Sequence, residues 1–189
     1  MTDYNVLIST VKNENSENTI LLCKELQKII PNSIYTQDIL TTPIKIQILE
    51  HNKLPYTIKI AYKDIKYDFK IIEYKSTKAL NNQNQISGYN PQLVVNNFNT
   101  DIGTNILNIL MELFPYDFSA RNRQVVNFTN KNDYIFFRMY RYIFKEDSSI
   151  DFAEIGPRLI LKLSKIIDNE NTFNIKYSSK KYSSETAII

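Results

Sequence analysis

Residues 134–144 read YIFFRMYRYIF, and this stretch decides what kind of fold the chain adopts. It is rich in aromatic and β-branched residues, which favour a strand. Side chains alternate between the two faces of a strand, so one face receives Tyr134, Phe136, Arg138, Tyr140, Tyr142 and Phe144. The other face receives Ile135, Phe137, Met139, Arg141 and Ile143. The second set is mostly a core face, which leaves Arg138 between aromatic rings on the first.

Polar and basic residues flank the strand expected at 124–128, just before this stretch. Arg121, Arg123 and Gln124 lie at its start, and Asn130, Lys131 and Asn132 follow it, in segments expected to be mostly loops. Such side chains can donate hydrogen bonds to phosphates and to base edges. Downstream, Gly156-Pro157 predicts a sharp turn or bulge before a strand at 159–166. Arg158 and Lys162 extend the positive surface if they point outward.

The chain repeats one plan on either side of this centre. The first half is expected to hold a strand at 6–8, a helix at 17–30 that ends at Pro31, and strands at 44–49, 56–62 and 67–74. The second half is expected to hold a strand at 93–95, a helix at 102–114 that ends at Pro115, and strands at 124–128, 134–144 and 159–166. The order predicts an α/β fold of two similar lobes, about 1–80 and 92–177, with a linker at 81–91 and a tail at 178–189.

The composition predicts one compact, folded unit. The 189 residues are 43% hydrophobic and 23% charged, as in ordinary globular proteins. No apolar run approaches the roughly 18 residues that span a bilayer, so we expect an intracellular protein without a membrane segment. The single cysteine, Cys23, excludes an internal disulfide and is expected to be a buried apolar residue.

Catalytic motifs are missing from the sequence. An enzyme needs a nucleophile with its base, a carboxylate pair, a metal cage or a phosphate-binding loop. The three glycines lie far apart, and the single histidine, His51, stands in a charged segment expected to be a turn. We therefore expect no enzyme, no cofactor, no metal and no small-molecule substrate.

Arginine is confined to one region of the chain. All five arginines fall between Arg121 and Arg158, whereas the lysines are spread along the sequence. Arginine has a planar fork suited to bidentate contacts and stacking, so this confinement favours a binding role. Chance and structural ion pairs are the alternative.

Two interpretations of the aromatic and arginine face stay open. Its rings could stack unpaired bases while its arginines hold phosphates, as in proteins that bind irregular RNA. Alternatively, the strand is buried on both sides and its arginines reach carboxylates such as Asp133 or Glu154. The neighbouring loop donors favour RNA.

Several motifs resemble a known family. The run FTNKNDYIFFRMYRYIF at 128–144, followed by EIGPRLILKL at 154–163, is similar to the second half of the Brix domain of eukaryotic ribosome assembly factors. Further similar runs are RNRQVVNF, NVLIST, CKELQKIIPNS, LVVNNFNTDIG and LFPY. The resemblance covers about residues 4–177 and is strongest from Pro91 to Leu163. Within the family, the chain looks most like the large-subunit branch.

The resemblance implies two lobes, each like an anticodon-binding domain with a small mixed sheet and packed helices. It also implies that the segment 121–144 binds ribosomal RNA. The residues to which it assigns this role are Arg121, Arg123, Gln124, Asn130, Arg138 and Arg141; Lys131, Asn132, Tyr140, Arg158 and Lys162 complete the expected site. The implied partners are precursor RNA of the large subunit, a MAK-type assembly factor and other pre-ribosomal proteins, in the nucleolus.

The chain departs from the family in its first half, where Lys63 to Phe69 replace a segment like HLPxGPTAxF. It also begins almost at its first strand, which predicts a shortened version. Three other functions stay open: a small-subunit factor of the same family, a scaffold whose aromatic and arginine face binds a protein, and a module that handles transfer RNA.

Overall fold

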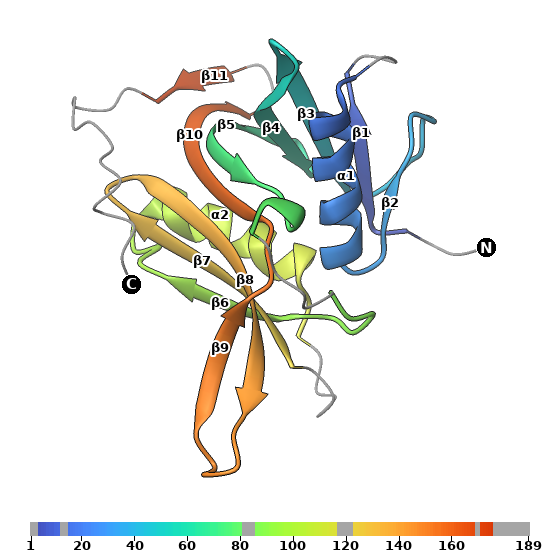
Figure 1. Ribbon diagram of the computed structural model, residues 1–189. Helices are drawn as coiled ribbons and strands as arrows, with labels where there is room; N and C mark the ends of the chain where they lie inside the picture. The colour runs from blue at the N-terminus through green and yellow to red at the C-terminus, as the bar shows by residue number, and fades with distance from the viewer. Residues whose placement is uncertain (1–3, 12–14, 81–85, 117–122, 169–170, 176–189) are drawn as a thin grey trace.

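The computed structural model describes residues 4–11, 15–80, 86–116, 123–168 and 171–175 (Figure 1). Its elements follow in chain order: β1 (Val6–Thr10), α1 (Glu17–Ile29), β2 (Ser33–Tyr35), β3 (Ile44–His51), β4 (Leu54–Tyr62), β5 (Ile65–Lys75), the 3₁₀ turn η1 (Lys78–Leu80), β6 (Gln92–Asn96), α2 (Asp101–Leu113), β7 (Gln124–Lys131), β8 (Tyr134–Phe144), β9 (Ile150–Glu154), β10 (Arg158–Asp168) and β11 (Asn171–Asn174). The predicted α/β class is confirmed.

One mixed sheet joins both halves of the chain. Its central order is β2-β1-β3-β4-β5-β10-β8-β7-β6, with β9 on β8 and β11 on β10. From each edge inward the plan is the same. Apart from the short edge strand β2, which pairs in parallel with β1, a first strand pairs in parallel with the first long strand after the helix, β1 with β3 and β6 with β7, and antiparallel strands come next. The two copies meet where β5 and β10 pair antiparallel.

Each helix begins at a residue that caps it. The hydroxyl of Ser16 accepts a hydrogen bond from the Thr19 amide, and Thr100 does the same for Gly103 at 3.0 Å. Gly103 also lies against the backbone of Phe98, where a Cβ would stand 3.0 Å from the carbonyl carbon. Both helices end within one residue of the predicted positions, just before Pro31 and Pro115.

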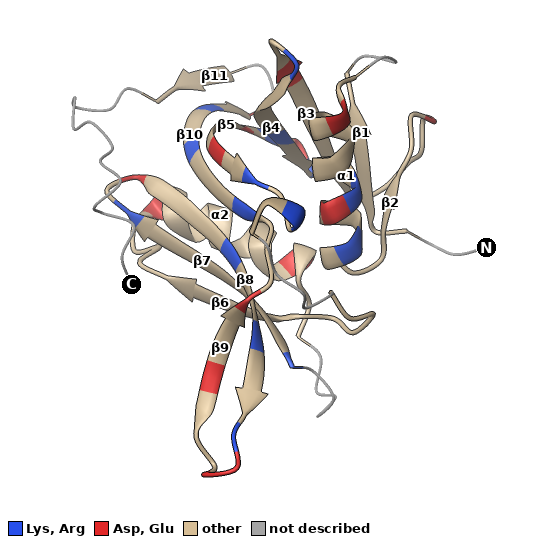
Figure 2. Ribbon diagram, viewed as in Figure 1, with Lys and Arg blue, Asp and Glu red and all other residues tan. Residues whose placement is uncertain are grey.

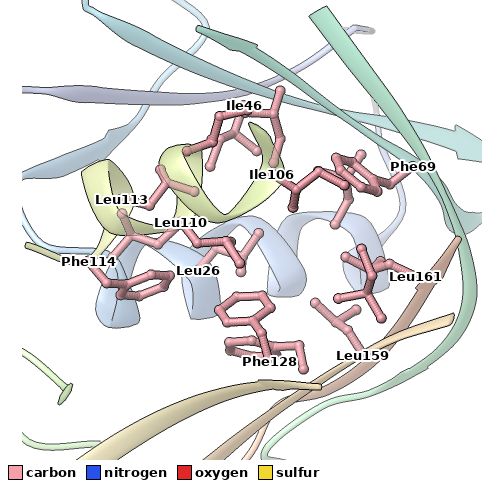
Figure 3. Close-up of a pocket in the computed structure, with 16 residues that line it drawn as sticks. Leu26, Ile46, Phe69, Ile106, Leu110, Leu113, Phe114, Phe128, Leu159 and Leu161 are labelled. Atoms are coloured by element: carbon pink, nitrogen blue, oxygen red, sulfur yellow. The ribbon is translucent and has the colours of Figure 1, made fainter. Parts of the chain in front are cut away.

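Both helices pack on the same face of the sheet. Figure 3 shows side chains of α1, α2 and the strands pointing toward one another around a small apolar cavity, with Leu26, Leu110, Phe128 and Leu161 among them. Cys23 is fully buried in this core, as predicted, and burial raises the pKa of its thiol to about 12. The opposite face of the sheet, which we call the outward face, is the part that concerns function.

Three strands of the described structure were not predicted from the sequence. These are β2, β9 and β11, each of three to five residues. The strand β9 matters most, because it pairs with the second half of β8 and extends it as a two-stranded ribbon away from the main body (Figure 1). We call this feature, residues 140–154, the β8–β9 ribbon.

Among the described residues, no helix is long and apolar enough to cross a membrane.

Candidate nucleic-acid interface

The register of the sheet fixes which side chains lie on the outward face. Phe137 pairs with Phe128 and Leu159, and all three belong to the core. Their neighbours along the strands therefore point outward. On β8 these are the residues predicted for the first face, Tyr134, Phe136, Arg138, Tyr140, Tyr142 and Phe144. The predicted core face is confirmed for Ile135, Phe137 and Met139, each at most 5% exposed.

Two arginines on the outward face share one carboxylate. Arg158 binds Glu154 through two hydrogen bonds, from Nε at 3.0 Å and from Nη2 at 2.6 Å. Arg138 approaches the same carboxylate, with Nη1 3.6 Å from Oε2. The three side chains are only 18–24% exposed, so water screens them little. We call this group the arginine hub; it carries a net charge of about +1 and holds two planar forks in place.

Tyr140 borders the arginine hub. Burial raises the pKa of its phenol, and Arg138, which also hydrogen-bonds to the phenol, opposes that rise. Because burial dominates, the phenol of Tyr140 stays neutral at neutral pH, and the hydrogen bond holds its ring beside a guanidinium. Arg158 likewise gains a raised pKa, mainly from its hydrogen bonds to Glu154.

The β8–β9 ribbon exposes aromatic rings on the same face. Phe144 and Phe152 are 59% and 60% exposed. Phe152 contacts Tyr142 with ring centroids 5.0 Å apart, and the guanidinium of Arg123 lies 5.4 Å from the Phe144 ring. A two-stranded ribbon has no core of its own to cover such rings. They form an open stacking platform beside a cation.

Lysines from the first half of the chain join the same face. Alternation and register point six of them outward from β3, β4, β5 and β10, together with Asp68, while Glu73 and Lys75 form a further outward pair where β5 meets Arg158. Lys59 Nζ lies 3.9 Å from Oδ2 of Asp68. We call this group the lysine panel: Lys45, Lys59, Lys66, Lys70, Lys162 and Lys165. Figure 2 marks basic positions along β5 and β10.

The lysine panel was not predicted from the sequence, in which the lysines are spread along the chain. A signal was present: in IKIQI, IKIAY and IKYDFKI each lysine alternates with buried apolar residues. Alternation places these lysines on a solvent face, but only strand order reveals that they share it.

The far end of the face holds the tight turn between β7 and β8. Asn132 and Asp133 both have positive φ, 52° and 65°, as a two-residue hairpin requires. Lys131 and Asn132 are exposed there. Lys162 Nζ lies 4.4 Å from the centre of the Tyr134 ring, which links this end to the lysine panel.

Two predicted site residues do not reach the surface as expected. Gln124 is 1% exposed, and its amide binds the backbone of Ser87 and Tyr89, so it anchors the segment 87–89. Asn130 lies within β7 rather than in a loop, opposite the core residue Ile135, and its Oδ1 is buried. The prediction of exposed donors was wrong for both.

The other predicted residues are placed as follows. Arg121 lies outside the described residues. Arg141 pairs with Gln124 and Ala153 and points away from Arg138, as alternation predicted. Arg123, Lys131, Asn132, Arg138, Tyr140, Arg158 and Lys162 lie at or beside the outward face.

Both interpretations of β8 describe part of it. Its first half is buried on both sides, since Phe136 is only 8% exposed on the outward face. The interpretation of a strand buried on both sides named Glu154 as a carboxylate that its arginines reach, and Glu154 does form an ion pair with Arg138. The second half, on the β8–β9 ribbon, has the open rings that the RNA interpretation requires.

Replacing Glu154 with glutamine separates these roles. Loss of the shared carboxylate should lower the free energy of unfolding by about 1–3 kcal/mol, because two guanidiniums then face each other without their anion. If the arginine hub binds phosphate, RNA affinity should rise a few-fold. Urea denaturation and filter binding measure the two effects. Asp151→Asn is the matched control, since Asp151 pairs with Lys145 at a more exposed site on the opposite face of the ribbon, where the cost should stay below about 1 kcal/mol. Lower stability with unchanged RNA binding would make the hub purely structural.

Among the described residues, no group of three or more His, Cys, Asp or Glu side chains is placed to hold a metal ion.

Comparison with known proteins agrees with this architecture. The family model of the Brix domain matches residues 12–165. A Brix domain-containing protein of Caenorhabditis elegans is 35% identical over 177 residues, which cover 84% of this chain and 45% of that protein. Ribosome production factor 1 of Pongo abelii is 30% identical over 192 residues, which cover 93% of this chain and 54% of that protein. The chain thus spans about half the length of these relatives.

A solved structure shows the same fold at low sequence identity. The crystal structure of a probable ribosomal biogenesis protein from Aeropyrum pernix aligns with a TM-score of 0.56 and 11% identity, over 84% of this chain and 96% of that one. The resemblance first drawn from the motifs of the second half is confirmed by the family model and by the relatives. This chain belongs to the Brix domain family.

Proposed function

We propose that this chain is a non-catalytic ribosome assembly factor that binds precursor ribosomal RNA of the large subunit. One observation carries the proposal: the outward face gathers basic side chains from both halves of the chain, beside exposed aromatic rings. Membership of the Brix domain family and similarity to ribosome production factor 1 support the ribosomal cargo. The setting we infer is the nucleolar precursor particle, beside a MAK-type protein partner and other pre-ribosomal proteins.

The chemistry of the face suits irregular RNA. Phosphates attract the basic side chains at every sequence, while unpaired bases stack on rings. The RNA site we propose comprises Arg123, Lys131, Asn132, Arg138, Tyr140, Arg158 and Lys162. Its contacts position and stabilise RNA and require no bond to be made or broken.

Replacing Arg138 with alanine should weaken RNA binding about tenfold and reduce the slope of log affinity against log salt by about one. The loss follows from one phosphate contact, and Glu154 and Arg158 remain paired to each other. Fluorescence anisotropy at several salt concentrations measures both quantities. Unchanged affinity would remove Arg138 from the site.

Arg141→Ala is the comparison from the opposite face of β8. An equal loss for Arg141→Ala would mean that RNA wraps both faces of the ribbon, and a smaller loss would confine it to the outward face. Thermal melting verifies that each variant folds.

A protein-binding scaffold is the second candidate. The observation that favours it is the exposure of Ile143, Phe144, Ile150 and Phe152 on the β8–β9 ribbon, because aromatic residues are also enriched at protein interfaces. A stable RNA-free complex that buries Phe144 would support this candidate. The cargo itself is tested by co-purification, since precursors of the large and small subunits carry different RNA.

A further inference from the structure

We propose that the outward face recognises a junction between paired and unpaired RNA, with the lysine panel on the paired part and the β8–β9 ribbon on the unpaired part. This inference rests on the proposed function and divides its site into two chemically different regions. The division follows from which side chains each region contains.

The lysine panel has the chemistry of a backbone-binding surface. Its six cations stand on four adjacent strands, about 15 Å across at the usual strand spacing. Lysine is a point charge on a flexible stem and does not select a base by a bidentate fork. The outward positions interleaved with these lysines on β3 and β4 are Gln47, Leu49, Thr57 and Ala61, which offer no ring for stacking. Such a surface fits the phosphates of a helix whose bases are already paired.

Like charges within the panel point to an anionic ligand. Lys70 stands directly opposite Lys162 on neighbouring strands. Like charges in this arrangement destabilise a sheet, and the one acid within the panel, Asp68, faces Lys59 and Lys165 instead. A polyanion across the pair turns this repulsion into attraction.

The β8–β9 ribbon has the complementary chemistry. Phe144 and Phe152 are more than half exposed, Tyr142 packs on Phe152, and Arg123 lies over Phe144. Rings and guanidinium planes stack on bases that are not already paired. The ribbon extends from the main body (Figure 1). An unpaired RNA strand that leaves an RNA duplex bound to the lysine panel can therefore follow the ribbon.

The arginine hub joins the two regions. Arg158 and Lys162 are both on β10, two residues either side of Ile160, while Glu154 is the last residue of the ribbon strand β9. Two guanidinium forks thus stand where the panel ends and the ribbon begins. This is the place where the backbone of a junction changes direction, and forks that bind phosphate in a fixed geometry suit it.

The experiment compares three RNA probes: a blunt duplex of about 12 base pairs, an unstructured single strand, and the same duplex with a single-stranded 3′ extension. The native chain should bind the extended duplex at least about tenfold more tightly than either part, because two linked contacts reinforce each other. The triple variant Lys59→Gln/Lys66→Gln/Lys70→Gln should lose about tenfold for both duplex probes. Its salt slope on the duplex should fall by about two to three. Its affinity for the single strand should stay within about twofold.

Two further variants make the test specific. Lys24→Gln/Lys28→Gln/Lys78→Gln removes the same charge from exposed positions on α1 and η1 and should leave all three affinities within about twofold. Replacing the three panel lysines with arginine keeps the charge and should preserve duplex binding. The junction proposal would be wrong if the panel variant and its control lost equal RNA affinity. It would also be wrong if the native chain did not prefer the extended duplex. If the native chain binds the single strand alone, the inference fails and the proposed function stands. If it binds none of the probes, both fail.

Discussion

Phe137→Ala is expected to lower the free energy of unfolding by about 3–5 kcal/mol, the largest stability change among the variants considered. The ring is 2% exposed and contacts Phe128 with centroids 5.0 Å apart. It also lines the apolar cavity between the helices and the sheet, so the vacated volume adds to an existing void. Domains are stable by only about 5–15 kcal/mol, and the loss is a large part of that. Urea denaturation at neutral pH measures it.

The matched control lies seven residues along the same strand. Phe144→Ala removes an identical side chain that is 59% exposed, so its cost should stay below about 1 kcal/mol, mainly from the contact with Arg123. Equal destabilisation by the two substitutions would contradict the placement of β8 in the fold.

The largest effect on RNA is expected for Phe144→Ala/Phe152→Ala. Stacking of one base on an aromatic ring contributes about 1–3 kcal/mol, so loss of both rings should lower the affinity for an unstructured single strand by at least about thirtyfold. Little of this loss should depend on salt, because stacking releases no counterions. Fluorescence anisotropy with a labelled single strand measures the affinity.

Two exposed rings away from the ribbon provide the control for this variant. Tyr56 and Phe173 are 45% and 55% exposed, and Tyr56→Ala/Phe173→Ala should leave RNA binding unchanged. If the ribbon variant keeps full RNA affinity while it loses a protein partner, the rings serve the scaffold function instead.

The sequence predicted the helices and the decisive strand closely because local signals define them. Ser16 and Thr100 cap the helices, and Pro31 and Pro115 follow their ends. The strand at 134–144 has the predicted bounds, because eleven residues of strand-forming type are bounded by a turn at Asn132 and Asp133. The repeated plan of the two halves was also visible, since each copy follows the same local order.

Features that depend on pairing between distant segments were not predictable. Gln124 looks like an exposed donor in the sequence, yet its partners Ser87 and Tyr89 lie more than 30 residues away and fill its hydrogen bonds inside the protein. The short strand β9 has little pattern of its own and exists because β8 offers it an edge. The lysine panel needs the order of four strands before its members become neighbours. The arginine hub was predicted in part. The sequence suggested Glu154 as a partner for arginine, but not that Arg138 and Arg158 share its carboxylate.

The pairing of β5 with β10 has a consequence for how the protein is made. The last residue of β10 is synthesised 93 positions after the last residue of β5, so several seconds pass at about 5–20 residues per second. Throughout that interval the strands β1 to β5 have been made but β10, the neighbour of β5 in the sheet, has not. The edge of β5 therefore exposes unpaired backbone groups. An open edge of this kind is a template for aggregation. The nascent chain therefore passes through a stage in which the exposed edge of β5 can pair with another chain, and the arrival of β10 ends that stage.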